Sequence, residues 1–188
     1  MRKPFYITLA VTAALSATLL PLAVWNGNGF LVTLATTVAT TCYHFLMRLL
    51  VGVAVKATFP KQIDPQNRWF RERSWEKKCY RFLRVRSWAK HVPTFRPDEF
   101  DLQKHGYGGL ARQTCLSELV HELIILLGFG SLFFCFFFDD PLANLAPFLI
   151  TAILAGMYDM QFVILQRYNR PMLLRLAARS KRRTVCEK

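Results

Sequence analysis

Ionisable side chains interrupt the most apolar stretches of this chain. Glu118, His121 and Glu122 recur at spacings i, i+3 and i+4, so they share one face of a helix. A histidine with a carboxylate one turn away is the arrangement that general-base chemistry requires. Because ionisable groups within apolar spans are costly, we treat these three residues as candidate catalytic groups.

Two other apolar stretches carry polar residues at a similar depth. His44 and Arg48 lie four residues apart, while Asp159, Gln166 and Arg170 recur near helical spacing. Arg48 and Asp159 each lie roughly 10 Å inside the boundary of an apolar stretch, at about 1.5 Å per helical residue. The pattern predicts a polar pocket walled by apolar helices. A purely structural ion pair, such as Arg48 with Asp159, is the alternative.

The elements that position these residues follow from the segregation of apolar and charged residues. The chain has 188 residues, of which 53% are hydrophobic, and a net charge of +13. Four apolar blocks each reach the ~20 residues that a helix needs to cross a bilayer. They cover roughly residues 4–24, 30–55, 116–138 and 142–165. A soluble single domain is therefore disfavoured, and no nucleic-acid partner is expected despite the charge.

The positions of Lys and Arg predict the topology. Neither residue type occurs in 25–29 or 139–146, whereas most of them lie in 56–112 or from 167 onward. This pattern places both termini in the cytoplasm by the positive-inside rule. The first block is expected to be a retained membrane helix, because its apolar core is too long for a secretory signal.

We therefore expect an all-α integral membrane protein with four transmembrane helices in two antiparallel hairpins. The turns are predicted at Asn26-Gly27-Asn28-Gly29 and at Asp139-Asp140-Pro141. The expected divisions are a first transmembrane hairpin (1–55), a basic aromatic cytoplasmic loop (56–115), a second hairpin (116–166) and a basic cytoplasmic tail (167–188).

The middle of the loop interleaves aromatic residues with cations. Ser74 is expected to cap a helix beginning at Trp75, with Trp75, Cys79 and Phe82 on one face. A basic amphipathic helix of this kind lies in the membrane interface. Its cations either attract anionic lipid or hold the phosphates of an activated donor. The residues considered for this role are Lys77, Lys78, Arg81, Arg84, Trp88 and Lys90.

The five cysteines show no C-x-x-C spacing. Neither a disulfide framework nor a zinc site is therefore expected. The main hypothesis requires no metal.

Three short motifs carry a resemblance to a known family. They are Val85-Arg86-Ser87-Trp88-Ala89-Lys90, Ser117-Glu118-Leu119-Val120-His121, and Gln166-Arg167-Tyr168-Asn169-Arg170-Pro171 followed by a basic tail. Over roughly residues 75–183 they resemble the CrtO family, the glycosyl-4,4'-diaponeurosporenoate acyltransferases. The chain departs from the family example at Glu122, where that example has a Trp.

The resemblance implies a small, membrane-embedded bacterial protein. The family's named member attaches a fatty acyl chain to the sugar of a glycosylated carotenoid, the last step of staphyloxanthin synthesis. By this resemblance we expect multi-pass insertion in the bacterial plasma membrane and a lipid or glycolipid acceptor. No residue of the sequence indicates a carotenoid.

The residues and the resemblance together predict O-acyl transfer from a cytoplasmic acyl thioester to a lipid hydroxyl. The expected co-substrate is acyl-CoA or acyl-carrier protein, with no bound cofactor. His121 is expected to act as general base, and Glu118 or Glu122 to orient it.

Eight further residues are expected to bind substrate. They are His44, Arg48, Asp159, Gln166, Arg167, Tyr168, Asn169 and Arg170. Among them, Arg167, Asn169 or Arg48 is expected to stabilise the oxyanion of the thioester carbonyl. The motif at 166–171 either binds substrate in this way or simply terminates the last helix.

Two other hypotheses stay open at this point. In the first, a metal-dependent membrane enzyme uses the ligands His44, Glu118, His121, Glu122 and Asp159. In the second, the chain is a small transporter or assembly partner, and the intramembrane charges form structural ion pairs.

Overall fold

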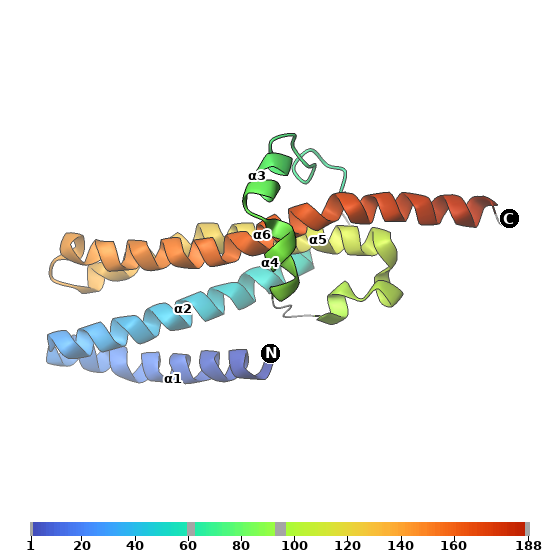
Figure 1. Cartoon of the computed structure of the whole chain (residues 1–188). Coiled ribbons are helices and arrows are strands. Elements are labelled where there is room, and N and C mark those ends of the chain that lie inside the picture. Colours follow the sequence, from blue (N-terminus) through green and yellow to red (C-terminus); the bar gives the residue numbers. More distant parts are fainter. Residues whose placement is uncertain (1, 60–62, 93–96, 187–188) are drawn as a thin grey trace. The chain divides into compact units, whose positions relative to one another are not determined.

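A computed structural model describes residues 2–59, 63–92 and 97–186 (Figure 1). Within these residues all regular elements are helices and no strand occurs, which confirms the expected all-α class. The long helices are α1 (Arg2–Asn26), α2 (Gly29–Thr58), α5 (Leu102–Gly128) and α6 (Pro141–Cys186). The short elements are α3 (Glu76–Phe82), α4 (Val85–Trp88) and the 3-10 helices η1 (Ala89–His91), η2 (Pro97–Phe100) and η3 (Phe129–Phe137).

Four helical segments are long and apolar enough to cross a membrane, as the sequence predicts. They are Lys3–Asn26, Gly29–Thr58, Leu102–Phe137 and Pro141–Arg182, with mean hydropathies between 1.6 and 2.1. Each is longer than the ~20 residues that a bilayer core requires. By length and composition the chain is thus a multi-pass membrane protein.

Each of the two expected turns precedes a helix, and its residues make the contacts at the helix start that their types predict. Gly27 adopts a positive φ of 60°, and the Asn28 side chain accepts a hydrogen bond of 2.9 Å from the backbone N–H of Phe30 at the start of α2. Asp140 Oδ1 likewise accepts bonds from the N–H groups of Leu142 and Ala143. The rings of Phe5 on α1 and Phe45 on α2 pack 5.1 Å apart, so these two helices are in contact.

All three expected division points fall inside helices. The first, at residue 55, lies within α2, which continues to Thr58. α5 begins at Leu102, well before residue 116, with a kink at Gly106, and α6 continues through the basic tail to Cys186. The ends of the apolar blocks do not mark the ends of these helices, because hydropathy indicates only the part of a helix that suits a bilayer core. The four-part division itself stays a prediction.

The end of the third membrane-length segment is a 3-10 helix, η3. The Tyr43 hydroxyl donates a bond of 2.5 Å to the carbonyl of Leu127. In a continuous α-helix that carbonyl would accept the N–H of Ser131 instead. The Ser131 hydroxyl donates to the carbonyl of Gly128 at 2.8 Å. These contacts coincide with the change of helix type, which the sequence analysis did not predict.

The chain forms two compact units. Unit 1 comprises residues 1–53 and 123–158, and unit 2 comprises residues 54–122 and 159–188. Unit 1 buries small and aliphatic side chains, among them Ala35, Ala39 and Ile124. The charged residues that are buried within the described part of the chain, Glu76, Glu118, Asp159 and Arg170, all belong to unit 2.

The short helix of the basic loop differs in detail from the prediction. α3 begins at Glu76, and Trp75 occupies the N-cap position without a side-chain cap, so the prediction that Ser74 caps the helix is wrong. The Glu76 N–H is instead bonded to the carbonyl of Arg73 at 3.1 Å in a preceding turn. The expected apolar face points outward: the exposed fractions are 55% for Trp75 and 87% for Phe82. Contact of this face with the membrane stays a prediction.

Candidate functional site

Within unit 2, a histidine of α5 meets a carboxylate of α6. The distance between His121 Nδ1 and Asp159 Oδ1 is 2.9 Å. Phe162, one turn after Asp159 on α6, stacks on the imidazole with a centroid distance of 4.5 Å. The Asp159 side chain is 3% exposed and that of His121 is 20% exposed. This geometry fixes the ring and leaves Nε2 as the imidazole nitrogen for a substrate.

The expected partner of His121 was wrong. The sequence analysis predicted that Glu118 or Glu122 orients the imidazole, whereas the structure gives this contact to Asp159. Glu122 instead accepts a hydrogen bond of 3.1 Å from the indole N–H of Trp69, and both oxygens of Glu118 accept bonds from arginines. Spacing along one helix shows which residues share a face with His121, but it cannot show which residue of another helix faces it.

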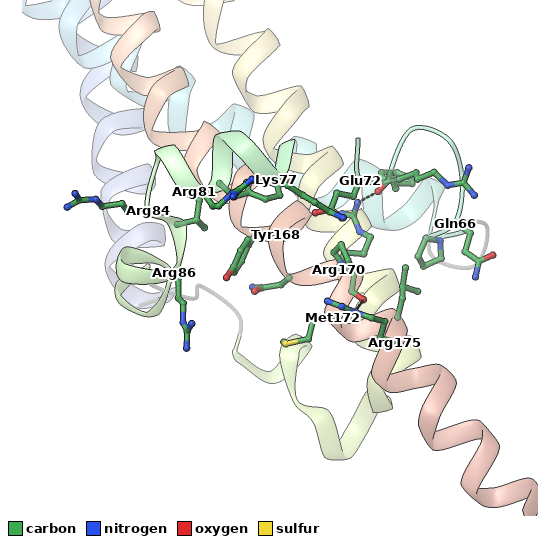
Figure 2. Close-up of a pocket in the computed structure, with 18 residues that line it drawn as sticks. Gln66, Glu72, Lys77, Arg81, Arg84, Arg86, Tyr168, Arg170, Met172 and Arg175 are labelled. Carbon is green, nitrogen blue, oxygen red and sulfur yellow. Dashed lines mark hydrogen bonds and ion pairs between the residues drawn. The ribbon is translucent and has the colours of Figure 1, made fainter. Parts of the chain in front are cut away.

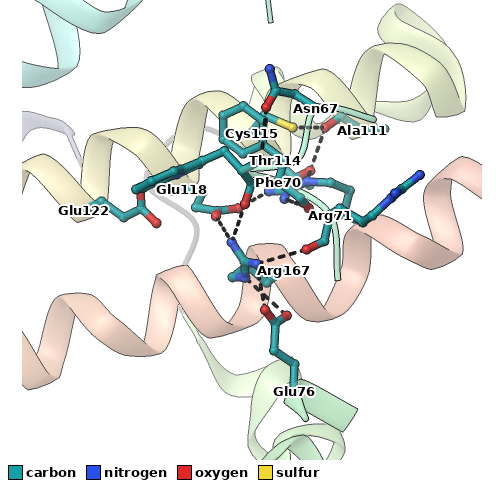
Figure 3. Close-up of polar contacts among 12 residues, drawn as sticks. Asn67, Phe70, Arg71, Glu76, Ala111, Thr114, Cys115, Glu118, Glu122 and Arg167 are labelled. Atoms are coloured by element: carbon teal, nitrogen blue, oxygen red, sulfur yellow. Dashed lines mark hydrogen bonds and ion pairs between the residues drawn. The ribbon is translucent and has the colours of Figure 1, made fainter. Parts of the chain in front are cut away.

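Arg167 is the centre of a buried charge network (Figure 3). Its guanidinium donates to Glu118 Oε1 at 2.5 Å and to both oxygens of Glu76, at 2.7 and 3.3 Å. It also donates to the carbonyls of Trp69 and Arg71, at 3.2 and 3.3 Å. These contacts use all five N–H groups of the guanidinium. Arg167 therefore has no donor left for the oxyanion role, for which the sequence suggested Arg167, Asn169 or Arg48.

Arg170 extends this network one turn further along α6. It is 1% exposed, and it donates to Glu118 Oε2, to the carbonyl of Phe70 at 2.8 Å and to the Thr114 hydroxyl at 3.0 Å. The Phe70 ring also lies 5.2 Å from its guanidinium carbon. Two arginines thus balance Glu76 and Glu118 and fasten the loop, α3 and α5 to α6. The arginines of the motif at 166–171 therefore have a structural role.

The carboxylate of this network that lies outside the membrane-length helices is Glu76. Burial alone would raise its pKa, but hydrogen bonds from Arg167 and from the Tyr80 hydroxyl outweigh burial, and the pKa is lowered. Burial raises the pKa of Tyr80 well above its usual value, and the hydrogen bond that its hydroxyl donates to the Glu76 carboxylate raises it further. At neutral pH Glu76 is therefore ionised and Tyr80 is neutral.

A pocket of about 1230 Å³ opens in unit 2 beside this network (Figure 2). Seven of its lining residues are cations, namely Arg71, Lys77, Arg81, Arg84, Arg86, Arg170 and Arg175, and Glu72 is the acidic one. Of the residues considered for phosphate binding, Lys77, Arg81 and Arg84 line the pocket. Lys78, Trp88 and Lys90 do not, and the Trp88 indole donates to the carbonyl of Leu83.

The cations at Arg71, Arg86 and Arg175 were missed by the sequence analysis. Arg175 lies on α6 beyond the motif at 166–171, and Arg71 precedes α3. Such residues are typical of any basic loop or tail, so their types alone carried no signal. Only the folded chain brings them to one hollow.

The other residues expected to bind substrate occupy different places. Tyr168 and Asn169 line the pocket, and the Tyr168 ring meets that of Tyr80 edge-on at 5.5 Å. Gln166 is buried, at 8% exposure, and follows Phe162 by one turn of α6. His44 and Arg48 belong to unit 1, where Arg48 donates to the carbonyl of His44.

The metal hypothesis requires at least three ligands in one place. Across residues 2–59, 63–92 and 97–186, no group of three or more His, Cys, Asp or Glu side chains is arranged to hold a metal ion. The described residues therefore do not gather the ligand set of that hypothesis, which comprised His44, Glu118, His121, Glu122 and Asp159.

Comparison with known proteins bears directly on this site. The family model described as CrtO, glycosyl-4,4'-diaponeurosporenoate acyltransferase, matches residues 66–179. The match covers more than half of the chain and includes the His121–Asp159 pair, the charge network and the pocket lining apart from Pro65. Searches of curated proteins and of solved structures return no significant match.

Proposed function

The chain belongs to the CrtO family, and from this premise we propose that it is a membrane O-acyltransferase. It transfers a fatty acyl group from a cytoplasmic acyl thioester to a hydroxyl of a lipid or glycolipid. The observation that carries the proposal is the His121–Asp159 pair within the matched residues. An imidazole oriented by a buried carboxylate is suited to deprotonate an alcohol.

The proposed step begins at the acceptor hydroxyl. His121 Nε2 takes its proton while the oxygen attacks the thioester carbonyl carbon. The C–S bond then breaks, the new ester leaves, and the thiolate takes the proton back from the imidazolium. Asp159 accepts a hydrogen bond from Nδ1–H throughout. It also stabilises the imidazolium that forms between the two proton transfers.

The charge network supports this step by positioning the helices. Glu118 lies one turn before His121 on α5, and Arg167 lies two turns after Asp159 on α6. Their 2.5 Å contact fixes the register of the two helices close to the catalytic pair. In this proposal Glu118 and Arg167 are positioning residues. Gln166, Tyr168 and Asn169 stay candidates for substrate contact.

The long apolar helices supply the lipid side of the proposal. Large apolar side chains on them are exposed, for example Leu126, Phe133 and Leu154. In a bilayer such faces contact acyl chains, so a lipid acceptor and the transferred chain share this environment. We place the four spans in two antiparallel hairpins of a bacterial plasma membrane, with both termini cytoplasmic.

A reconstituted transfer assay tests the proposal. The purified full-length protein in nanodiscs receives an isotope-labelled acyl thioester and a bacterial lipid extract, and mass spectrometry detects labelled esters. We expect His121→Ala to lose the product, whereas His105→Ala, an exposed position on α5, retains it. Equal product from His121→Ala and wild type, with both proteins folded, would contradict the proposal.

A further inference from the structure

Several of the cationic side chains that line the pocket of unit 2 form no ion pair within the described part of the chain. Lys77 Nζ lies 3.7 Å from Glu72 Oε2, and Arg170 forms an ion pair with Glu118. In contrast, none of the guanidinium groups of Arg71, Arg81 and Arg84 forms an ion pair with a residue in the described part of the chain. The same holds for Arg86. Arginines that surround a hollow and keep unused N–H groups form a site for a ligand with several anionic groups.

An aromatic ring lies inside this cationic hollow. Tyr168 lines the same hollow as Arg86 and Arg170 (Figure 2). Tyr168 is half-buried and is held edge-on by Tyr80. A fixed ring among arginines offers a stacking surface for a flat base next to donors for phosphates. The pocket, at about 1230 Å³, is large enough for a nucleotide.

We propose that this pocket binds the phosphorylated adenosine portion of an acyl-coenzyme A. The inference rests on the proposed acyl transfer and names its donor as a coenzyme A thioester. Arg81, Arg84 and Arg86 bind the diphosphate and the ribose phosphate. Tyr168 stacks on the adenine.

The distance between the pocket and His121 supports a donor of this shape. Both lie in unit 2, and α6 connects them: Asp159 contacts His121, whereas the stretch that lines the pocket begins at Tyr168 and ends at Arg175. The rise from Asp159 to Arg170 is roughly 16 Å at about 1.5 Å per residue. A donor that fills both places must have a long spacer between its phosphates and its reacting carbonyl. The pantetheine arm of coenzyme A is such a spacer, whereas in a phospholipid the ester lies close to the phosphate.

A carrier protein would require a different site. It delivers its acyl group on a single phosphodiester-linked arm and docks through its own folded surface. Here the cations line a hollow that includes a stacking ring, which a folded protein partner does not need. The observations therefore favour a small nucleotide.

Binding of adenosine 3',5'-bisphosphate to the purified full-length protein in nanodiscs tests the inference without any catalytic step. We expect saturable binding at 150 mM salt, stronger than that of inorganic pyrophosphate and retained in His121→Ala. Nanodiscs prepared with and without phosphatidylglycerol distinguish a nucleotide site from a lipid-headgroup site. Loss of nucleotide binding specifically in the anionic nanodiscs would assign the pocket to lipid and overturn the inference.

Matched charge changes localise the binding. The double variant Arg81→Gln/Arg86→Gln removes two pocket cations, and we expect its Kd to rise roughly tenfold or more. The control Arg73→Gln/Arg179→Gln removes two exposed cations that do not line the pocket, and its Kd should stay within about twofold. An equal loss in both variants would show general electrostatic attraction and contradict the proposal.

A second measurement needs no variant. Phenylglyoxal modifies exposed arginines, and peptide mass spectrometry maps the modified positions. Adenosine 3',5'-bisphosphate should protect Arg81, Arg84 and Arg86 but not Arg73 or Arg179. The absence of selective protection would overturn the inference.

The two proposals fail in different ways. Transfer from acyl-carrier protein, with no nucleotide binding, would overturn the donor assignment and leave the acyltransferase standing. Pocket-specific nucleotide binding without transfer of any acyl group would support the pocket as a nucleotide site and contradict the proposed reaction.

Discussion

In the proposed reaction, a buried carboxylate determines which nitrogen of His121 faces the substrate. Asp159 Oδ1 accepts a hydrogen bond from the Nδ1–H group, and the stacked Phe162 ring prevents the imidazole from tilting away. Nε2 is then unprotonated when the imidazole is neutral, which is the form that a general base needs. The reactive tautomer thus depends on a single contact between α5 and α6.

Replacing this carboxylate tests its role as a positioning group. In Asp159→Asn the amide can donate to Nδ1 and so favour the wrong tautomer, and we expect kcat to fall roughly 100-fold or more while KM changes little. Steady-state transfer kinetics measure both constants. Asp139→Asn, at an exposed turn position, should retain the wild-type kcat. A KM effect with an unchanged kcat would contradict the positioning role.

The catalytic role that the sequence suggests for His121 stays a prediction, and the sequence did not predict the contact of His121 with Asp159. Spacing within one helix singled out His121, because a 3.6-residue period places Glu118 and Glu122 beside it. The carboxylate that contacts it comes from residue 159, and only the pairing of two helices brings the two side chains together. The hydrogen bonds that occupy all N–H groups of the Arg167 guanidinium could not be predicted for the same reason, since the acceptors lie on three other segments.

The buried ion pairs hold three helices together, namely α3, α5 and α6. Glu118 has no exposed surface and balances two arginines of α6, while Glu76 brings α3 to the same place. Removing one partner of such a network leaves an unpaired buried charge, which is far costlier than losing a surface ion pair. The register of α5 and α6 is therefore sensitive to single substitutions here.

Glu118→Gln should destabilise the protein by about 3–5 kcal/mol, because it leaves the buried guanidinium of Arg170 without its carboxylate and removes one of the two carboxylates that Arg167 contacts. Thermal unfolding in detergent, followed by tryptophan fluorescence, measures the loss. Glu122→Gln, one turn along α5, keeps an acceptor for Trp69 and should cost less than about 1 kcal/mol. Similar unfolding temperatures for the two variants would contradict the network's structural role.

The stability of α3 should depend on pH on both sides of neutrality. The folded pKa of Glu76 is lowered, so its stabilisation is present above the unfolded value of roughly 4.3 and is lost as pH falls through the folded pKa. The folded pKa of Tyr80 is raised, so its contribution is present below roughly 10 and is lost as pH rises beyond that value.

Unfolding temperatures measured from pH 3 to 11 check this dependence. In Glu76→Gln the loss of stability on the acid side should become shallower, and in Tyr80→Phe the alkaline loss should become shallower. An unchanged acid profile for Glu76→Gln would show that other carboxyl groups control acid unfolding.

At the scale of the whole chain, the apolar and basic residues occupy different segments. The four membrane-length helices carry exposed large apolar side chains, while most of the cations lie in the loop and at the end of α6. Lipid is the solvent that matches such surfaces. The positive-inside pattern then predicts that the loop and both termini lie on the cytoplasmic side.

Cysteine labelling in intact cells tests this topology. In a cysteine-free variant, Asn28→Cys and Asp139→Cys should react with a membrane-impermeant maleimide added outside. Arg179→Cys should react only after the membrane is opened. Labelling of Arg179→Cys from outside would contradict the proposed orientation.

The large-scale features were the easiest to predict from the sequence. Apolar blocks of ~20 residues are a one-dimensional signal, and the turn residues Gly27 and Asp140 mark helix starts by their own chemistry. The start of α5 at Leu102 and the 3-10 helix η3 were not foreseen. The latter accompanies a hydroxyl of Tyr43, 84 residues away, that bonds the carbonyl of Leu127.

Comparative lipid mass spectrometry tests the central claim most directly. Three strains are compared: one without the gene, one with it restored, and one restored with His121→Ala at equal protein level. We predict that one lipid class gains a single acyl group in the restored strain and does not gain it in the other two. Identical lipid profiles in all three strains would contradict the assignment of acyl transfer to this protein.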